Sequence, residues 1–128
     1  MFQDGLHGNK LLIVLAINGV CTVARTTSKS SGKSRSYGCH SYDRYPNFFI
    51  PSEAGIFNED TWICLDYLVD FDGVAFAGKL VQRQVRKITE LSRGLLIDLL
   101  NCAIDSDDVT AQQVERLKVS RQKLEAVK

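Results

Sequence analysis

Apolar residues in the first two thirds of the chain fall into short runs that are typical of β-strands. The continuous aliphatic run over residues 10–17 predicts a strand that is buried on both faces. Asn18-Gly19 follows it, and both residues tolerate the positive φ of a type I′ turn, so the pair indicates a tight hairpin. The β-branched run over 20–27 predicts the returning strand. Further strands are expected over 47–51, 61–68 and 79–88, with a mobile lead-in over 1–9 and a turn at Asp70, Asp72 and Gly73.

Helical patterns occupy the last third. Ser92 is placed to cap a helix that carries paired leucines at 95–96 and 99–100. Thr110 and Gln113 have the spacing of a capping box and predict the start of a second helix. The apolar stripe of that helix (Val114, Leu117, Leu124 and Val127) is expected to pack on the strands. We therefore predict a mainly β domain over 1–128, with a small β-barrel over about 10–91 and two C-terminal α-helices over about 92–127.

Composition excludes several classes. The 128 residues suit one domain, and a net charge of +1 argues against a wholly basic nucleic-acid binder. No apolar run approaches the roughly 20 residues of a membrane span, and no signal peptide is recognisable, so a cytoplasmic protein with reduced cysteines is expected. Cys39 and His40 are adjacent and cannot easily share one tetrahedral ion, so we predict neither a metal site nor a cofactor.

The serine-rich segment over 28–45 is predicted to be a long flexible loop. From Arg25 to Arg44 the chain has five basic residues and one acidic residue, interleaved with tyrosines. Basic groups attract phosphate, and tyrosine rings stack on unpaired bases, so the segment predicts a surface for single-stranded RNA. The alternative is an ordinary solvated loop. The RNA-binding candidates here are Ser28, Lys29, Lys33, Arg35 and Tyr37.

Four segments, in this order, resemble the PemK/MazF family of toxin–antitoxin ribonucleases. They are the strand that opens at Lys10, the Thr26-Thr27-Ser28 strand end, the W-I-C-L-D-Y segment over 62–67 and the R-K-I-T-E-L-S segment over 86–92. The resemblance covers roughly residues 10–104. Lys10 stands where the family has arginine and Cys64 where it often has another arginine, and only nine residues precede Lys10, where the family has a further N-terminal strand.

The resemblance implies an SH3-like barrel that acts as a metal-independent endoribonuclease on single-stranded RNA. It also implies a cytoplasmic homodimer that is neutralised by an antitoxin protein. Asp66 would be the general base, Arg25 the acid or phosphate clamp, and Thr26 and Thr27 hydroxyl donors to the phosphate, which Lys10 would also contact. The alternatives are a turn aspartate at the end of a strand, a surface arginine and ordinary strand threonines.

The sequence is also compatible with two other functions. One is a non-catalytic barrel that binds RNA or a protein partner. The other is an adaptor that contacts proteins through its C-terminal helices.

Overall fold

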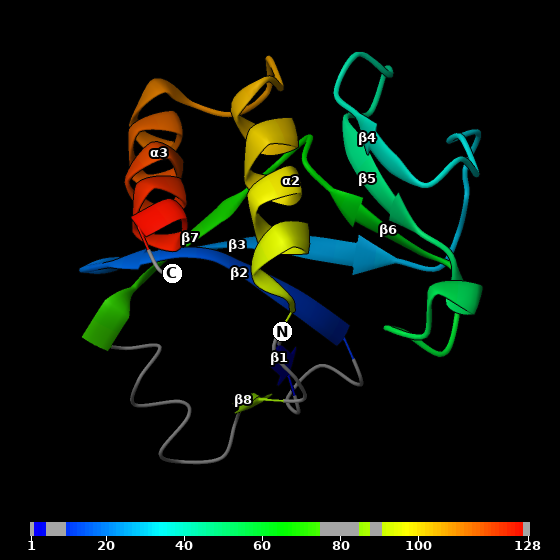
Figure 1. The fold of residues 1–128 in the computed structure, drawn as a ribbon, viewed down its shortest axis with the longest axis horizontal. Helices are drawn as coiled ribbons and strands as arrows, with labels where there is room; N and C mark the ends of the chain where they lie inside the picture. The colour runs from blue at the N-terminus through cyan, green and yellow to red at the C-terminus, as the bar shows by residue number, and fades with distance from the viewer. Residues whose placement is uncertain (1, 5–9, 75–84, 88–90, 127–128) are drawn as a thin grey trace.

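The computed structural model describes residues 2–4, 10–74, 85–87 and 91–126. Its strands pair antiparallel in the order β4-β5-β6-β3-β2-β1-β8, and β7 also pairs with β3 (Figure 1). A 3-10 turn, η1, spans Ser52–Ala54, and the helices are α2 (Arg93–Ile104) and α3 (Ala111–Ala126). The strands are β1 (Phe2–Asp4), β2 (Lys10–Asn18), β3 (Val20–Thr27), β4 (Gly38–His40), β5 (Asn47–Ile50), β6 (Thr61–Cys64), β7 (Val69–Asp72) and β8 (Val85–Lys87).

The β2–β3 hairpin forms at the predicted place, but the type I′ turn is wrong, because Asn18 still pairs with Val20 as the last residue of β2, which leaves Gly19 alone between the two strands. Gly19 lies at the tip with φ +71°, a left-handed conformation that glycine adopts at little cost. The end of β7 approaches this tip, where the Gly73 N–H donates to the Gly19 carbonyl at 2.9 Å. A Cβ at Gly73 would also lie 2.9 Å from that oxygen, so the contact requires glycine at this position.

One residue of β2 is left out of the regular pairing. The register with β3 shifts between Val14 and Ala16, which leaves Leu15 in a β-bulge. The Leu15 side chain is buried, and its carbonyl accepts a hydrogen bond of 2.9 Å from the Ser120 hydroxyl of α3. The bulge therefore supplies an attachment point for α3 on the sheet.

Strand β3 pairs with different strands along its length, and this feature positions the candidate site. Its N-terminal half pairs with β7, up to Val23 opposite Val69, whereas its C-terminal end pairs with β6, from Thr26 opposite Ile63. Only residues 24 and 25 of β3 lie between the two ladders, and residues 64–68 lie opposite them. The longer segment must therefore bulge out beside the middle of β3.

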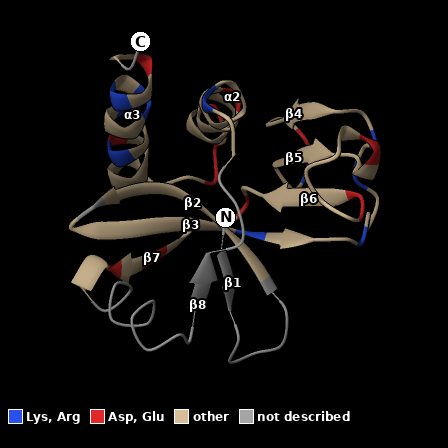
Figure 2. Ribbon diagram, turned by 60° about the horizontal axis from the view of Figure 1, so that its bottom comes forward, with Lys and Arg blue, Asp and Glu red and all other residues tan. Residues whose placement is uncertain are grey.

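Both helices pack on one face of the sheet. Figure 1 shows α2 between α3 and the β4–β5 end, with α3 over β2. The core is built from buried aliphatic and aromatic side chains of the strands together with the leucines of α2 and Leu117 of α3. In Figure 2, α3 carries basic and acidic residues along its length. Its predicted stripe packs inward, because Val114 and Leu124 contact the same core; Val127 lies outside the described residues.

The predicted helix caps are confirmed. Ser92 Oγ accepts the Leu95 N–H at 3.3 Å at the start of α2. At the start of α3, the Thr110 N–H donates to Gln113 Oε1 and the Gln113 N–H donates to Thr110 Oγ1, both at 3.1 Å. These reciprocal bonds form the capping box that the spacing predicts.

The mainly β class with two C-terminal helices is confirmed, but the closed barrel is not. Among the described residues, β4 and β8 at the two ends of the strand path do not pair with each other, so the sheet is open. The helices cover the face around which a barrel would close: α2 contacts β4 and β5, and α3 contacts β2.

Several strand predictions need correction. The lead-in contains β1, which pairs with β2 from Phe2 opposite Leu12, so a strand does precede β2. The strand predicted over 61–68 ends at Cys64, and the turn predicted at Asp70 and Asp72 is strand β7, because these residues pair with β3. The serine-rich segment contains the unpredicted strand β4. Of the strand predicted over 79–88, β8 is described and the rest lies outside the described residues.

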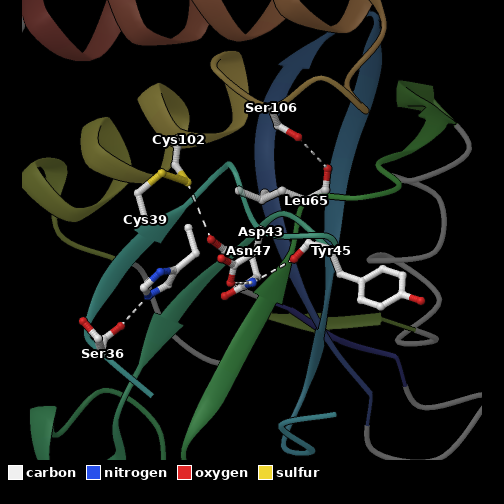
Figure 3. Close-up of a disulfide and its surroundings, with 9 residues drawn as sticks. Ser36, Cys39, Asp43, Tyr45, Asn47, Leu65, Cys102 and Ser106 are labelled. Atoms are coloured by element: carbon white, nitrogen blue, oxygen red, sulfur yellow. Dashed lines mark hydrogen bonds between the residues drawn. A yellow bond between two sulfur atoms is a disulfide. The ribbon is translucent and has the colours of Figure 1, made fainter. Parts of the chain in front are cut away.

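The expectation of reduced cysteines is wrong for one pair. Cys39 of β4 and Cys102 of α2 form a disulfide, with Cα atoms 5.5 Å apart, beside Asn47 at the start of β5 (Figure 3). Cys21 and Cys64 are free thiols. The disulfide is a long-range consequence of packing α2 against β4, which the spacing of the cysteines does not reveal.

A polar network fastens α3 to the sheet around Asp70. The carboxylate accepts hydrogen bonds from Thr22 Oγ1 at 2.7 Å and Gln113 Nε2 at 3.2 Å, and Arg116 forms an ion pair with it at 2.8 Å. Burial raises the pKa of Asp70, but the hydrogen bonds and the charge of Arg116 outweigh it, so the net pKa lies below its ordinary value. The ionised carboxylate therefore stabilises the folded state.

We expect the Asp70→Asn variant to be less stable than wild type at neutral pH, by on the order of 1 kcal/mol because the pair is partly exposed. Since the folded pKa is lowered, this contribution is present above about pH 4 and is lost as pH falls through the folded pKa. Urea unfolding at neutral and acidic pH measures the difference, with exposed Asp98→Asn as the control. A stability difference that does not change with pH would contradict the assignment.

Candidate functional site

A cleft of about 540 Å³ opens beside the C-terminal half of β3. Its walls come from β2, β3, the serine-rich segment and the end of β6. Four of the residues proposed from sequence for catalysis, together with one proposed for RNA binding, line this single cleft. The lining residues are Leu11, Leu12, Arg25, Thr26, Thr27, Ser31, Lys33, Tyr45, Cys64 and Asp66.

The bulged segment 64–68, opposite the middle of β3, explains why Asp66 reaches the cleft. Leu65 and Leu68 are buried and anchor the bulged segment in the core, whereas Asp66 and Tyr67 between them face outward. The Leu65 N–H donates to the Pro46 carbonyl at 2.8 Å, which fixes the start of this segment. Because the bulge lies beside the middle of β3, the Asp66 carboxylate lines the same cleft as Arg25.

The two basic groups of the cleft come from different segments. Arg25 is an exposed residue of β3, and its Cζ lies 5.6 Å from the centroid of the Tyr67 ring. Lys33 belongs to the serine-rich segment; its Nζ donates to the Ser30 carbonyl at 3.4 Å and lies 6.0 Å from the centroid of Tyr45. Both distances are within the range of cation–π attraction.

The serine-rich segment is fixed to the sheet. Trp62 is fully buried in β6, and its indole N–H donates to the Ser34 carbonyl at 2.9 Å. Arg35 lies over the Trp62 ring at 5.5 Å and forms an ion pair with Asp60 at 3.3 Å. These contacts are made by Ser34 and Arg35, the two residues that follow Lys33, and they hold Lys33 at the cleft rather than in a free loop.

The two threonines differ in what their hydroxyls can still do. Thr26 Oγ1 donates its hydrogen to the Leu11 carbonyl at 3.0 Å, so it cannot donate to a phosphate at the same time. Thr27 Oγ1 accepts the Lys29 N–H at 3.1 Å, which leaves its hydroxyl hydrogen available. Thr27 is therefore the better donor to a bound anion.

The charged side chains of the cleft shift the pKa of the Cys64 thiol. Burial raises its pKa, the Asp66 carboxylate raises it further, and Lys33 and Arg25 act in the opposite direction. The net pKa is above the ordinary value, so Cys64 is a protonated thiol at neutral pH and a weak nucleophile. Asp66, Lys33 and Arg25 all act on this thiol, which is consistent with their position around one site.

The remaining predicted residues lie outside the lining. Ser28 and Lys29 are exposed at the end of β3, and Arg35 is engaged by Trp62 and Asp60. The Tyr37 ring makes an edge contact with Phe48, with centroids 5.9 Å apart. Lys10 is the first residue of β2, and its side chain is not among those described.

Sequence reasoning missed several cleft residues. The sequence assigns Leu11 and Leu12 only to the buried strand, and it gives Ser31 and Cys64 no role in the site. It includes Tyr45 only as one of three tyrosines on the basic segment where unpaired bases could stack. Position alone offered a signal for Cys64, which is two residues before Asp66 in the same segment. Tyr45 and Ser31 reach the cleft only because the serine-rich segment folds back on β6.

The described residues show neither a metal cluster nor a membrane helix. In that part of the chain, no three His, Cys, Asp or Glu side chains gather closely enough to hold a metal ion. Neither α2 nor α3 is long and apolar enough to cross a bilayer. Asp66 is the one carboxylate among the residues that line the cleft.

Compared with protein-family models, curated proteins and solved structures, the chain shows no significant similarity to any of them.

Proposed function

We propose that the chain is an endoribonuclease that cleaves single-stranded RNA in the cleft beside β3, with the 2′-hydroxyl of the substrate as the nucleophile. One observation carries the proposal: a carboxylate, two cations and a free hydroxyl from three segments (Asp66; Arg25 and Thr27 of β3; Lys33) line one cleft. A carboxylate alone suits a turn, and cations alone suit a solvated surface. Their combination suits attack at a phosphodiester.

In this proposal each group has a separate task. The Asp66 carboxylate removes the proton from the 2′-hydroxyl, whose oxygen attacks the neighbouring phosphorus. The P–O5′ bond breaks, and the leaving oxygen takes a proton from water, which yields a 2′,3′-cyclic phosphate and a 5′-hydroxyl. Arg25, Lys33 and Thr27 bind the phosphate oxygens, where negative charge develops in the transition state. Arginine remains protonated in proteins, so Arg25 serves better as a clamp than as a proton donor.

The resemblance to the PemK/MazF family extends this proposal. A toxin of that kind would be metal-independent, would act in the cytoplasm as a homodimer, and would be neutralised by an antitoxin protein. The β2–β3 hairpin and the segment that carries Asp66 occur in the order that this resemblance requires. In a cytoplasmic setting the Cys39–Cys102 disulfide would face reducing conditions.

A non-catalytic RNA-binding protein is the second candidate. The hydroxyl of Thr26 is committed to the Leu11 carbonyl, so one of the proposed catalytic donors is unavailable. Among the described residues, no basic group lies within 4.0 Å of the Asp66 carboxylate to orient it. A site that only binds phosphate through Arg25 and Lys33 needs neither a free Thr26 hydroxyl nor a basic group that orients Asp66.

The experiment is incubation of the purified chain with a labelled single-stranded RNA in the presence of a chelator, beside a DNA of the same sequence. The proposal predicts that the RNA is cut and the DNA is not, because DNA lacks the 2′-hydroxyl. Binding of both with cleavage of neither would favour the second candidate. Cleavage of the DNA would contradict attack by the 2′-hydroxyl.

A further inference from the structure

Two exposed tyrosines lie close to cations of the cleft: Tyr45 lines the cleft itself, and Tyr67 lies beside it, next to the cleft residues Asp66 and Arg25. Tyr67 directly follows Asp66 and is 63% exposed, and the Arg25 guanidinium lies 5.6 Å from its ring centroid. Tyr45 lines the cleft and is 44% exposed, with Lys33 at 6.0 Å and Arg44 at 5.4 Å from its centroid. Exposed tyrosine rings beside cations suit a ligand that offers both a planar ring and a negative charge.

The two tyrosines are held by one connection in the backbone. Pro46, next to Tyr45, accepts the N–H of Leu65, two residues before Tyr67, at 2.8 Å. Figure 3 shows the Tyr45 ring pointing away from the disulfide and from β4. Both rings are thus carried by segments that are fixed to each other and to the core, since Leu65 and Pro46 are buried.

The open ring surface sets the chemistry of the partner. Tyr67 also borders a separate hollow of about 410 Å³ that Leu68, Asp70 and Gln113 help to line. With nearly two thirds of Tyr67 exposed, the ring keeps surface that Arg25 does not cover. A planar group that stacks there would sit next to an anion bound by Arg25. A nucleobase beside its own phosphate combines these two features.

We propose that Tyr67 and Tyr45 are stacking platforms for two unpaired bases on either side of the phosphate held in the cleft. This inference rests on the proposed function, because it places the phosphate between Arg25 and Lys33. The bases of a duplex stack on each other and leave no face for the tyrosines, so the ligand is single-stranded. The stacking itself does not use the 2′-hydroxyl, and single-stranded DNA therefore binds as well.

Other aromatic residues of the chain do not meet these conditions. Tyr37 uses its ring in an edge contact with Phe48, and Trp62 is buried under Arg35. Tyr42 is 91% exposed in the same segment as Tyr45, but it neither lines the cleft nor has Arg25 or Lys33 over its ring. Tyr42 is therefore a matched control for the loss of an exposed tyrosine.

The test is fluorescence anisotropy with a short single-stranded DNA, which binds without being cut. Tyr67→Leu and Tyr45→Leu should each weaken binding by roughly five- to a hundredfold, the range for loss of one stacked base. Tyr67→Phe keeps a ring and should recover most of the affinity that Tyr67→Leu loses, whereas Tyr42→Leu should bind like wild type. The same DNA with two adjacent abasic positions should bind wild type more weakly, and the duplex should bind weakly.

Failure of stacking and failure of the proposed function give different results. Unchanged affinity in both leucine variants, or equal affinity for the abasic strand, would overturn the platforms while phosphate binding survives. Binding without RNA cleavage would leave the platforms supported and remove the nuclease. If the chain binds none of these strands even at low salt, both proposals are wrong.

Discussion

Asp66→Asn should lower the rate of RNA cleavage by about 10²–10⁴-fold, the range for removal of a general base. Asparagine has nearly the same shape as aspartate, but its amide does not accept the proton of the 2′-hydroxyl at neutral pH. The substitution removes a negative charge from beside Arg25 and Lys33, so RNA affinity should stay equal or increase. Single-turnover cleavage kinetics measure the rate, and anisotropy with DNA measures the affinity.

The control for this variant is Asp107→Asn. Asp107 is an exposed carboxylate in the turn between α2 and α3 and is not among the cleft residues. The Asp107→Asn variant should cleave RNA at the wild-type rate. If Asp66→Asn also cleaves at that rate, Asp66 is a turn residue at the bulge, and the activity belongs to another site.

Cys39→Ala should lower the free energy of unfolding by about 4 kcal/mol under non-reducing conditions. The disulfide closes a loop with a sequence separation of 63, and cross-linking a loop of that size restricts the unfolded chain by about this amount. Cys39 is exposed, so the substitution leaves no core cavity, whereas Cys102 is buried. Urea unfolding monitored by the fluorescence of Trp62 measures the change.

Reductant provides the internal control for the disulfide. Wild type in reductant should fall to the stability of Cys39→Ala, and the variant should not respond to reductant. Cys64→Ala, which removes a free thiol, should keep the response to reductant. Equal stability of wild type and Cys39→Ala without reductant would show that the bond between β4 and α2 is absent in solution.

Local signals predicted the elements that depend on neighbouring residues. The β2–β3 hairpin follows from one Asn-Gly pair between two apolar runs, and the start of α3 from the Thr110–Gln113 spacing. These features need only side chains and backbone groups a few residues apart. The order of strands before helices followed for the same reason.

Features that depend on distant pairing were not predicted. Strand β4 has three residues in a serine-rich segment and exists because β5 pairs with it. The Cys39–Cys102 bond requires α2 to lie on β4. Asp70 and Asp72 are typical of a turn in sequence, but they form strand β7 because the N-terminal half of β3 pairs with them.

The candidate site contains residues that the sequence predicted and residues whose place depends on distant contacts. Arg25, Thr27 and Asp66 were selected by their resemblance to a family pattern, and the bulge opposite β3 brings them to one cleft. Lys33 was selected only as part of a basic segment, and its place in the cleft depends on the Trp62–Ser34 hydrogen bond. Tyr67 had no signal of its own, because its role follows from the position of Arg25 over its ring.

The most direct measurement uses a DNA strand that contains one ribonucleotide. Incubated with the chain in a chelator, this strand should be cut once, on the 3′ side of the ribonucleotide. Mass spectrometry should find a 2′,3′-cyclic phosphate on one product and a 5′-hydroxyl on the other. An uncut strand, or products that carry a 5′-phosphate, would contradict a cleft in which Asp66 activates the 2′-hydroxyl.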